Sequence, residues 1–246
     1  MVEIGCVDII TEVSTLALQM AMPREVHMNT VFHVFAYLKA RHNSRMVFDP
    51  TYLYIDKTNF KEHEWKRLYR DVKEAFLNSC PNPLGREVYL CMFVDLDHAT
   101  DETTRRSKTG YFIYMNSSLV NWLSKKKATI ETSVFGAEFV AMKQGMEAVR
   151  GIRYKFRMMG VRISGPTHVY GDIMSVIHNT QLPESTLRKK SNSICYHAVH
   201  ELVAMEESLT GHIPTVENCS DLATKIIPGG KMRDHFVGKL LFDIVD

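Results

Sequence analysis

Four acidic residues follow one another in a fixed order through the last two-thirds of the chain. Asp95 ends an apolar run, Glu138 opens a helical run, Asp172 follows a Gly-Pro break, and Asp221 precedes an apolar pair. A buried, unpaired carboxylate costs several kcal/mol, so four gathered acids require a compensating cation. Two divalent metal ions about 4 Å apart, held by carboxylates, can cleave a phosphodiester. If the four acids converge, the pattern predicts a nuclease; if they do not, it indicates an ordinary α/β domain.

Each acid also has a simpler interpretation. Asp97 would share the face of Asp95 if the strand continued, and either residue can form a turn. Asp172 and Asp221 can each be the N-cap of a following helix, with Ser220 as the rival cap for the second. Glu138 is the most informative acid, because it heads the helical row of small residues Ala141, Gly145, Ala148 and Ile152 that would face a sheet.

Composition is that of a globular protein. The 246 residues are 45% hydrophobic and 24% charged, which suits one large domain or one domain with an appendage. The net charge is only +2, but nine Lys and Arg residues lie between 122 and 162 against three Glu residues. This basic tract is able to meet a phosphate backbone, or to form solvated helix faces.

Cysteine usage and hydropathy narrow the cellular setting. The five cysteines are scattered and include no Cys-x-x-Cys pair, which predicts reduced thiols in an intracellular protein. The histidines have no zinc-type spacing. The N-terminus lacks the pattern of a signal peptide, and apolar runs are shorter than a membrane span.

Periodicity and turn residues predict two regions. Helical patterns cover 8–20, 27–40 and 62–76, and a Pro/Gly/Asn-rich loop at 78–85 is the expected boundary. Beyond it we predict a strand at 88–94, a hairpin of 111–115 with 119–123, and a long helix from Ser133 to about Met159. Further strands are expected at 167–170 and 213–216, and helical segments at 173–179, 191–208 and 221–226. The order predicts an α/β sheet of mixed direction.

The residues around the four acids resemble the ribonuclease H domain of copia-type retrotransposon Pol polyproteins. The resemblance covers roughly 86–230, and its motifs run in the family's order. They are Phe93-Val94-Asp95-Leu96-Asp97-His98-Ala99, Arg105-Arg106-Ser107-Lys108-Thr109-Gly110, Trp122-Leu123-Ser124-Lys125-Lys126-Lys127, Ala137-Glu138-Phe139-Val140-Ala141, Tyr170-Gly171-Asp172 and Ser220-Asp221-Leu222-Ala223-Thr224-Lys225.

The resemblance implies a ribonuclease H-like fold, with a mixed five-stranded sheet whose first three strands are antiparallel, flanked by helices. It implies that Asp95, Glu138, Asp172 and Asp221 hold two Mg²⁺ or Mn²⁺ ions and catalyse hydrolysis of the RNA strand of an RNA–DNA hybrid. Candidate substrate contacts are Arg105, Arg106, Ser107, Lys125 and Lys126.

Residues 1–80 resemble the helical segment that joins the reverse transcriptase to its ribonuclease H, and 86–246 form the expected ribonuclease H-like domain. The expected partners are therefore the hybrid and the reverse transcriptase part of the same polyprotein, without a membrane. The resemblance implies a cytoplasmic, virus-like-particle or nuclear location. The polymerase's paired-aspartate signature is absent from the sequence, so the chain is not expected to synthesise DNA by itself.

Three departures from the family pattern bear on activity. Ile173 follows the third acid where the family usually has Asn, Thr100 replaces a Gly, and Lys190-Ser191 replaces Lys-His. An alternative function is therefore a catalytically weakened relic that binds nucleic acid. An integrase or transposase core is a third hypothesis, but that class places its Glu last, whereas here the Glu comes second.

Overall fold

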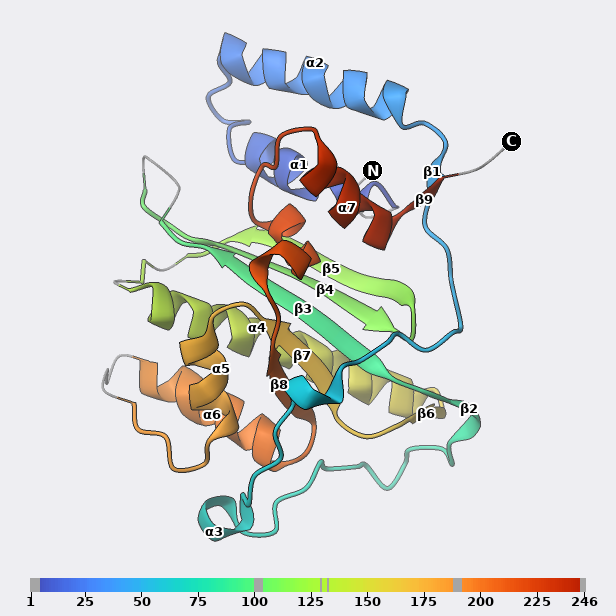
Figure 1. Ribbon diagram of the computed structural model, residues 1–246, viewed down its shortest axis with the longest axis vertical. Coiled ribbons are helices and arrows are strands. Elements are labelled where there is room, and N and C mark those ends of the chain that lie inside the picture. Colours follow the sequence, from blue (N-terminus) through green and yellow to red (C-terminus); the bar gives the residue numbers. More distant parts are fainter. Residues whose placement is uncertain (1–4, 100–103, 129, 132, 188–191, 244–246) are drawn as a thin grey trace.

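A five-stranded mixed sheet forms the centre of the computed structural model, which describes residues 5–99, 104–128, 130–131, 133–187 and 192–243 (Figure 1). The strand order is β5-β4-β3-β7-β8, with bounds β3 Leu90–Asp97, β4 Lys108–Met115, β5 Ser118–Lys126, β7 Thr167–Gly171 and β8 Ser208–His212. The first three strands are antiparallel, and β7 and β8 continue the sheet in parallel. The predicted mixed five-stranded sheet, with its first three strands antiparallel and helices on its faces, is confirmed.

Helices cover both faces of this sheet. One face carries α4 Val134–Met158, α5 Met174–Gln181 and α6 Ser193–Ala204, and the other carries α1 Ile10–Ala17, α7 Lys231–Leu240 and the 3₁₀ helices η2 Val7–Ile9 and η6 Cys219–Ala223. Helix α2 Glu25–Ala40 lies outside α1 and α7 (Figure 1). Two small two-stranded sheets pair β1 Ser44–Arg45 with β9 Phe242–Asp243, and β2 Leu84–Val88 with β6 Val161–Ile163.

Strand alternation explains why β3 is apolar on both sides. Met92 and Val94 belong to the core under α4, while Cys91 and Phe93 pack in the core shared with α7. Successive side chains on a strand point to opposite faces, so a sheet covered on both sides needs a continuous apolar run. This alternation also puts Asp95 on the same face as Cys91 and Phe93, toward η6.

The N-terminal part packs against the rest of the chain. The helices predicted at 8–20 and 27–40 are confirmed as α1 and α2, and Val7 and Ile10 are buried in the core beside α7. The helix predicted at 62–76 is wrong in extent, because only α3 Lys66–Tyr69 forms there. Most of the segment 41–83, which we call the strap, runs irregularly around the sheet to the lower end of the molecule. The domain boundary at 80–86 stays a prediction.

The hairpin, the long helix and the strand at 167–170 are confirmed, but the last strand was predicted too late in the chain. It is β8, whereas the segment predicted as a strand at 213–216 contains the 3₁₀ turn Thr215–Glu217, preceded by Pro214. Helix α6 is correspondingly shorter than the predicted 191–208. Thr100, Lys190 and Ser191 lie outside the described residues.

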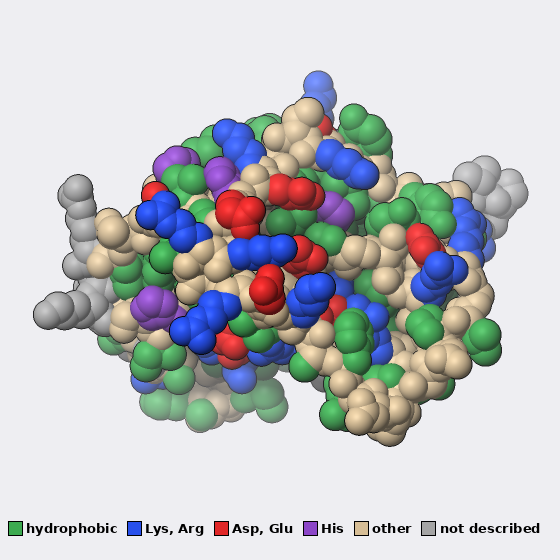
Figure 2. Space-filling model, turned by 90° about the horizontal axis from the view of Figure 1, so that it is seen from below, with side chains coloured by type: hydrophobic (Ala, Val, Ile, Leu, Met, Phe, Trp, Pro, Cys, Tyr) green, Lys and Arg blue, Asp and Glu red, His purple; other side chains and the backbone are tan. Residues whose placement is uncertain are grey.

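The lower end of the molecule, where the strap carries α3, mixes acidic and basic side chains (Figure 2). Exposed ion pairs join Arg67 to Glu184 and Lys66 to Asp71 there. A surface of mixed sign gives little net attraction for a polyanion.

Among the described residues, no helix combines the length and the apolar character that a membrane span needs.

Candidate active site

Two glycines bring the acid-bearing elements together. Gly145 of α4 lies against β3, where an added Cβ would meet the Met92 sulfur at 2.8 Å. Gly110 stands opposite Asp95 in the β3–β4 register, and an added Cβ there would meet the Ala223 Cβ at 2.6 Å. Real Cβ atoms do not approach so closely. A Cβ at Gly110 would also meet the Ala223 backbone at 2.9 Å, so this position requires glycine, whereas at Gly145 the flexible end of Met92 would have to move. The first contact sets α4, and hence Glu138, against the sheet; the second sets η6 beside Asp95.

Three of the predicted acids converge. Asp95 of β3, Glu138 of α4 and Asp172, which follows β7, each offer one carboxylate oxygen, and these oxygens all lie within 4.8 Å of one another. Asp95 and Glu138 are buried, while Asp172 is partly buried. Because two strands of the sheet and one helix packed on it supply these side chains, their meeting is a property of the tertiary fold.

Asp221, the fourth acid, lies beside Asp95 but outside the convergent group. It belongs to η6 and is 2% exposed. The Lys225 ammonium joins the two residues, with Nζ 2.8 Å from Asp221 Oδ1 and 3.3 Å from Asp95 Oδ2. The other three predicted acids therefore gather around Asp95.

Burial and mutual repulsion disfavour the ionised form of these acids. Burial, followed by the charges of Asp95 and Asp172, raises the pKa of Glu138 well above its ordinary range. Burial and Asp95 likewise raise the pKa of Asp172, and they raise the pKa of Asp221 to about 7. A bound cation would favour the ionised carboxylates. An all-oxygen set of carboxylates is the donor set that Mg²⁺ and Mn²⁺ prefer, so the residues fit the predicted ions.

The structure does not support the simpler helix-cap interpretations. Asp172 accepts a hydrogen bond at 2.9 Å from the Thr215 hydroxyl, while the N-cap of α5 is Ile173, whose apolar side chain cannot accept one. The N-cap of η6 is Asn218, so neither Asp221 nor Ser220 has that role. The Asn218 amide also donates to the Val94 carbonyl at 3.1 Å, which fixes η6 to the strand just before Asp95.

Asp95 itself differs from the sequence prediction in one respect. Strand β3 does not end there but continues to Asp97, which pairs in register with Lys108 of β4. Asp97 shares the face of Asp95, as the alternation required. It lines a pocket of about 280 Å³ with Arg106, Lys108 and Lys126 and stands outside the convergent triad. The rival acid thus has basic neighbours of its own.

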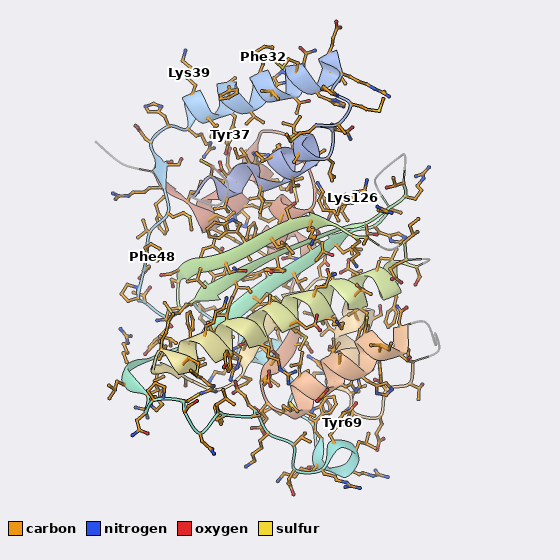
Figure 3. The ribbon with its side chains drawn as sticks, turned by 180° about the vertical axis from the view of Figure 1, so that it is seen from behind. Phe32, Tyr37, Lys39, Phe48, Tyr69 and Lys126 are labelled. Carbon is orange, nitrogen blue, oxygen red and sulfur yellow. The ribbon has the colours of Figure 1, made fainter. Side chains whose placement is uncertain are left out.

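The predicted substrate contacts lie at the same end of the sheet. Arg105, Arg106 and Lys125 are exposed, and Lys126 is partly buried at the end of β5 (Figure 3). Ser107 is buried, and its hydroxyl accepts a hydrogen bond from the Ala99 amide at 3.2 Å. That placement favours a role in holding the turn between β3 and β4 over a direct substrate contact.

Sequence reasoning did not assign a role to Thr224, Lys225 or Asn218. The Thr224 hydroxyl donates to the same Asp95 oxygen that Lys225 contacts. The four-residue spacing from Asp221 to Lys225 was the available signal, because one helical turn brings such side chains together. Lys127 belongs to the basic run of the sequence, but it is buried and donates to the Ala137 carbonyl at 2.5 Å. Burial lowers the pKa of Lys127 to about 8.

The chain is similar in sequence to Pol polyproteins of plant retrotransposons. It is 27% identical over 149 residues to the retrovirus-related Pol polyprotein from transposon TNT 1-94 of Nicotiana tabacum, a match that covers 61% of this chain and 11% of that protein. It is 25% identical over 141 residues to the polyprotein from transposon RE1 of Arabidopsis thaliana, covering 57% and 10%. The matched part thus spans about a tenth of the length of these relatives.

Comparison with solved structures finds LC11-RNase H1, isolated from compost by a metagenomic approach. It has a TM-score of 0.44 and 14% identity, with 55% of this chain and 92% of that chain covered. No family model matches the sequence. Through the matched segment, the chain is a distant homologue of the Pol polyproteins of copia-type retrotransposons.

Proposed function

We propose that this chain is an endonuclease that hydrolyses the RNA strand of RNA–DNA hybrids. The observation that carries the proposal is the convergence of Asp95, Glu138 and Asp172 within 4.8 Å, with Asp221 joined to Asp95 through Lys225. Buried carboxylates raise the energy of the fold unless a cation compensates them. Homology to retrotransposon Pol polyproteins makes a nucleic-acid substrate the natural choice.

Asp95, Glu138, Asp172 and Asp221 would hold two Mg²⁺ or Mn²⁺ ions. Bound divalent ions supply an activated water and neutralise charge on the attacked phosphate. The protein's part is to fix the carboxylates beforehand. The Thr224 hydroxyl holds Asp95, and the Thr215 hydroxyl holds Asp172. The Asn218 amide holds the β3 backbone at Val94, just before Asp95, so little reorganisation is needed when substrate arrives.

Arg105, Arg106, Lys125 and Lys126 are the proposed phosphate contacts, because they lie at the end of the sheet to which Asp95 belongs. Phosphate contacts give affinity without sequence specificity. Recognition of a hybrid then rests on its shape and on the 2′-hydroxyls of the RNA. The reverse transcriptase part of a polyprotein remains the proposed protein partner, with a cytoplasmic or nuclear location.

The test is cleavage of an RNA–DNA hybrid labelled on either strand, with duplex DNA and duplex RNA as competing substrates. In Mg²⁺ or Mn²⁺ we expect cleavage of the RNA strand alone, and we expect Asp95→Asn and Glu138→Gln to abolish it. Glu147→Gln is the matched control, because Glu147 lies on the same helix but pairs with Lys143 at the surface. Cleavage that survives both active-site substitutions would refute the assignment.

A weakened relic is the second candidate, and Ile173 is the observation that favours it. Ile173 packs against the core under α4 and leaves α5 without a side-chain cap. If the parent chain binds hybrid without cleaving it while Ile173→Asn cleaves, activity has been lost at this position. If neither chain cleaves and both bind, the chain is a binding module.

A further inference from the structure

Lys225 occupies a position between two carboxylates that the proposed function assigns to a metal ion. Its Nζ contacts Asp221 at 2.8 Å and Asp95 at 3.3 Å, and its backbone amide donates to the Asp221 carbonyl at 2.8 Å. The two Asp side chains are only 2–3% exposed, whereas the Lys225 side chain is 38% exposed. The ammonium thus enters the acidic site from solvent and bridges two buried carboxylates.

The four acids divide into two cation positions that share Asp95. The first consists of Asp95, Glu138 and Asp172, whose oxygens approach one another within 4.8 Å. Asp221 does not belong to that group. It forms the second position with Asp95, and there the ammonium already supplies the positive charge. A divalent ion and an ammonium cannot share one pair of carboxylates, because like charges at such separations repel strongly in a partly buried site.

We propose that Lys225 is a built-in cation at the Asp95–Asp221 position, an inference that rests on the proposed metal-binding function. The free chain then binds one divalent ion tightly, at Asp95, Glu138 and Asp172. A second ion binds only when the ammonium withdraws. Withdrawal is open to Lys225 because its flexible stem reaches solvent, where substrate phosphates offer the ammonium another anion.

A purely structural role for Lys225 predicts something different. The residue would then tie η6 to β3, and its loss would weaken the fold without changing how many ions bind. Lys225→Met separates the two roles, because methionine keeps an unbranched stem but removes the charge. Lys225→Gln is a second variant that keeps a polar end. Lys143→Met is the matched control, since Lys143 pairs with Glu147 on the outer surface of α4.

The experiment is calorimetric titration of the full chain with Mn²⁺ in the absence of nucleic acid, with Mn²⁺ electron paramagnetic resonance to detect neighbouring ions. We expect one tight ion in the parent and in Lys143→Met. In Lys225→Met and Lys225→Gln we expect the second ion to bind at least about tenfold more tightly than in the parent, a difference of about 1.4 kcal/mol. Circular dichroism melts establish that each variant is folded.

The outcomes distinguish this inference from the proposed function. Two tight ions in the parent, or a second ion unaffected by either Lys225 substitution, would overturn the role of Lys225. Asp95→Asn and Glu138→Gln should remove the first ion; if the parent binds none, the metal site itself is refuted and the inference fails with it. If the Lys225 effect appears but no hybrid is cleaved, only the proposed activity fails.

Discussion

Replacing Glu74 by alanine should destabilise the whole fold, although Glu74 lies in the irregular strap. Its carboxylate accepts from Arg153 at 3.0 and 2.7 Å and from Arg157 at 3.1 Å. The Arg153 side chain is 2% exposed and that of Glu74 is 14% exposed. Removing one partner of a fully buried ion pair costs about 3–5 kcal/mol, because the other charge stays buried. Arg153 keeps bonds to Gly165 and Thr167, so we expect a loss of about 2–4 kcal/mol.

Urea unfolding followed by circular dichroism measures this loss. The control is Glu184→Ala, which removes an ion pair whose side chains are 70–79% exposed and should cost less than about 0.5 kcal/mol. Adding Arg153→Met to Glu74→Ala should recover part of the stability, because the unpaired charge is then gone. If Glu74→Ala costs no more than Glu184→Ala, or the second substitution deepens the loss, the strap does not neutralise a buried charge.

Three further predictions concern helix ends, packing and pH. Ser133→Ala should cost about 1 kcal/mol in urea unfolding, because the Ser133 hydroxyl caps α4 by accepting from the Gly136 amide at 3.2 Å. Gly110→Ala should destabilise the fold by about 1–3 kcal/mol and reduce hybrid cleavage, since its Cβ would displace η6 and Asp221; Gly151→Ala, with open space around it, should do neither. His200 is buried, which lowers its pKa from 6.5 to about 4, so the unfolded chain takes up a proton before the folded chain does. The contribution of His200 to stability should therefore be complete above pH 6.5 and fall toward pH 4 by at most about 3 kcal/mol, and the difference between the parent and His200→Gln measures it.

The central sheet was predictable because its signals are local. The apolar run of β3, the turn residues between β4 and β5, and the Ser133 cap each act over a few residues. The small-residue row of α4 correctly predicted the face that meets the sheet, where Gly145 touches Met92. The order of the acids along these elements then placed them at one site.

The errors arose where tertiary contacts decide the structure. Strand β8 has the sequence Ser-Leu-Thr-Gly-His, with little strand propensity, yet it forms by pairing with β7 and leaves room at Gly211 for the Phe60 ring. The more β-prone Ile213 to Val216 is interrupted by Pro214. In the strap, the helical pattern at 62–76 forms only the single turn α3. The backbone beyond it is irregular, because Glu74 must reach Arg153 of α4, which is distant in the sequence. No local pattern records such a partner.

The N-terminal segment helps to hold the acidic residues in place, a role that no pattern in its own sequence indicates. The Thr11 hydroxyl of α1 donates to the Leu222 carbonyl of η6 at 2.7 Å, in the residue next to Asp221. Glu12 holds the buried Arg233 of α7 at 2.7 Å, and Arg233 also binds the Asp8 carbonyl. Because α1 and α7 enclose η6, the position of Asp221 relative to Asp95 depends on residues that resemble a mere connection. A chain that lost this segment would keep all four acids in its sequence but would lack the packing that holds the fourth in place.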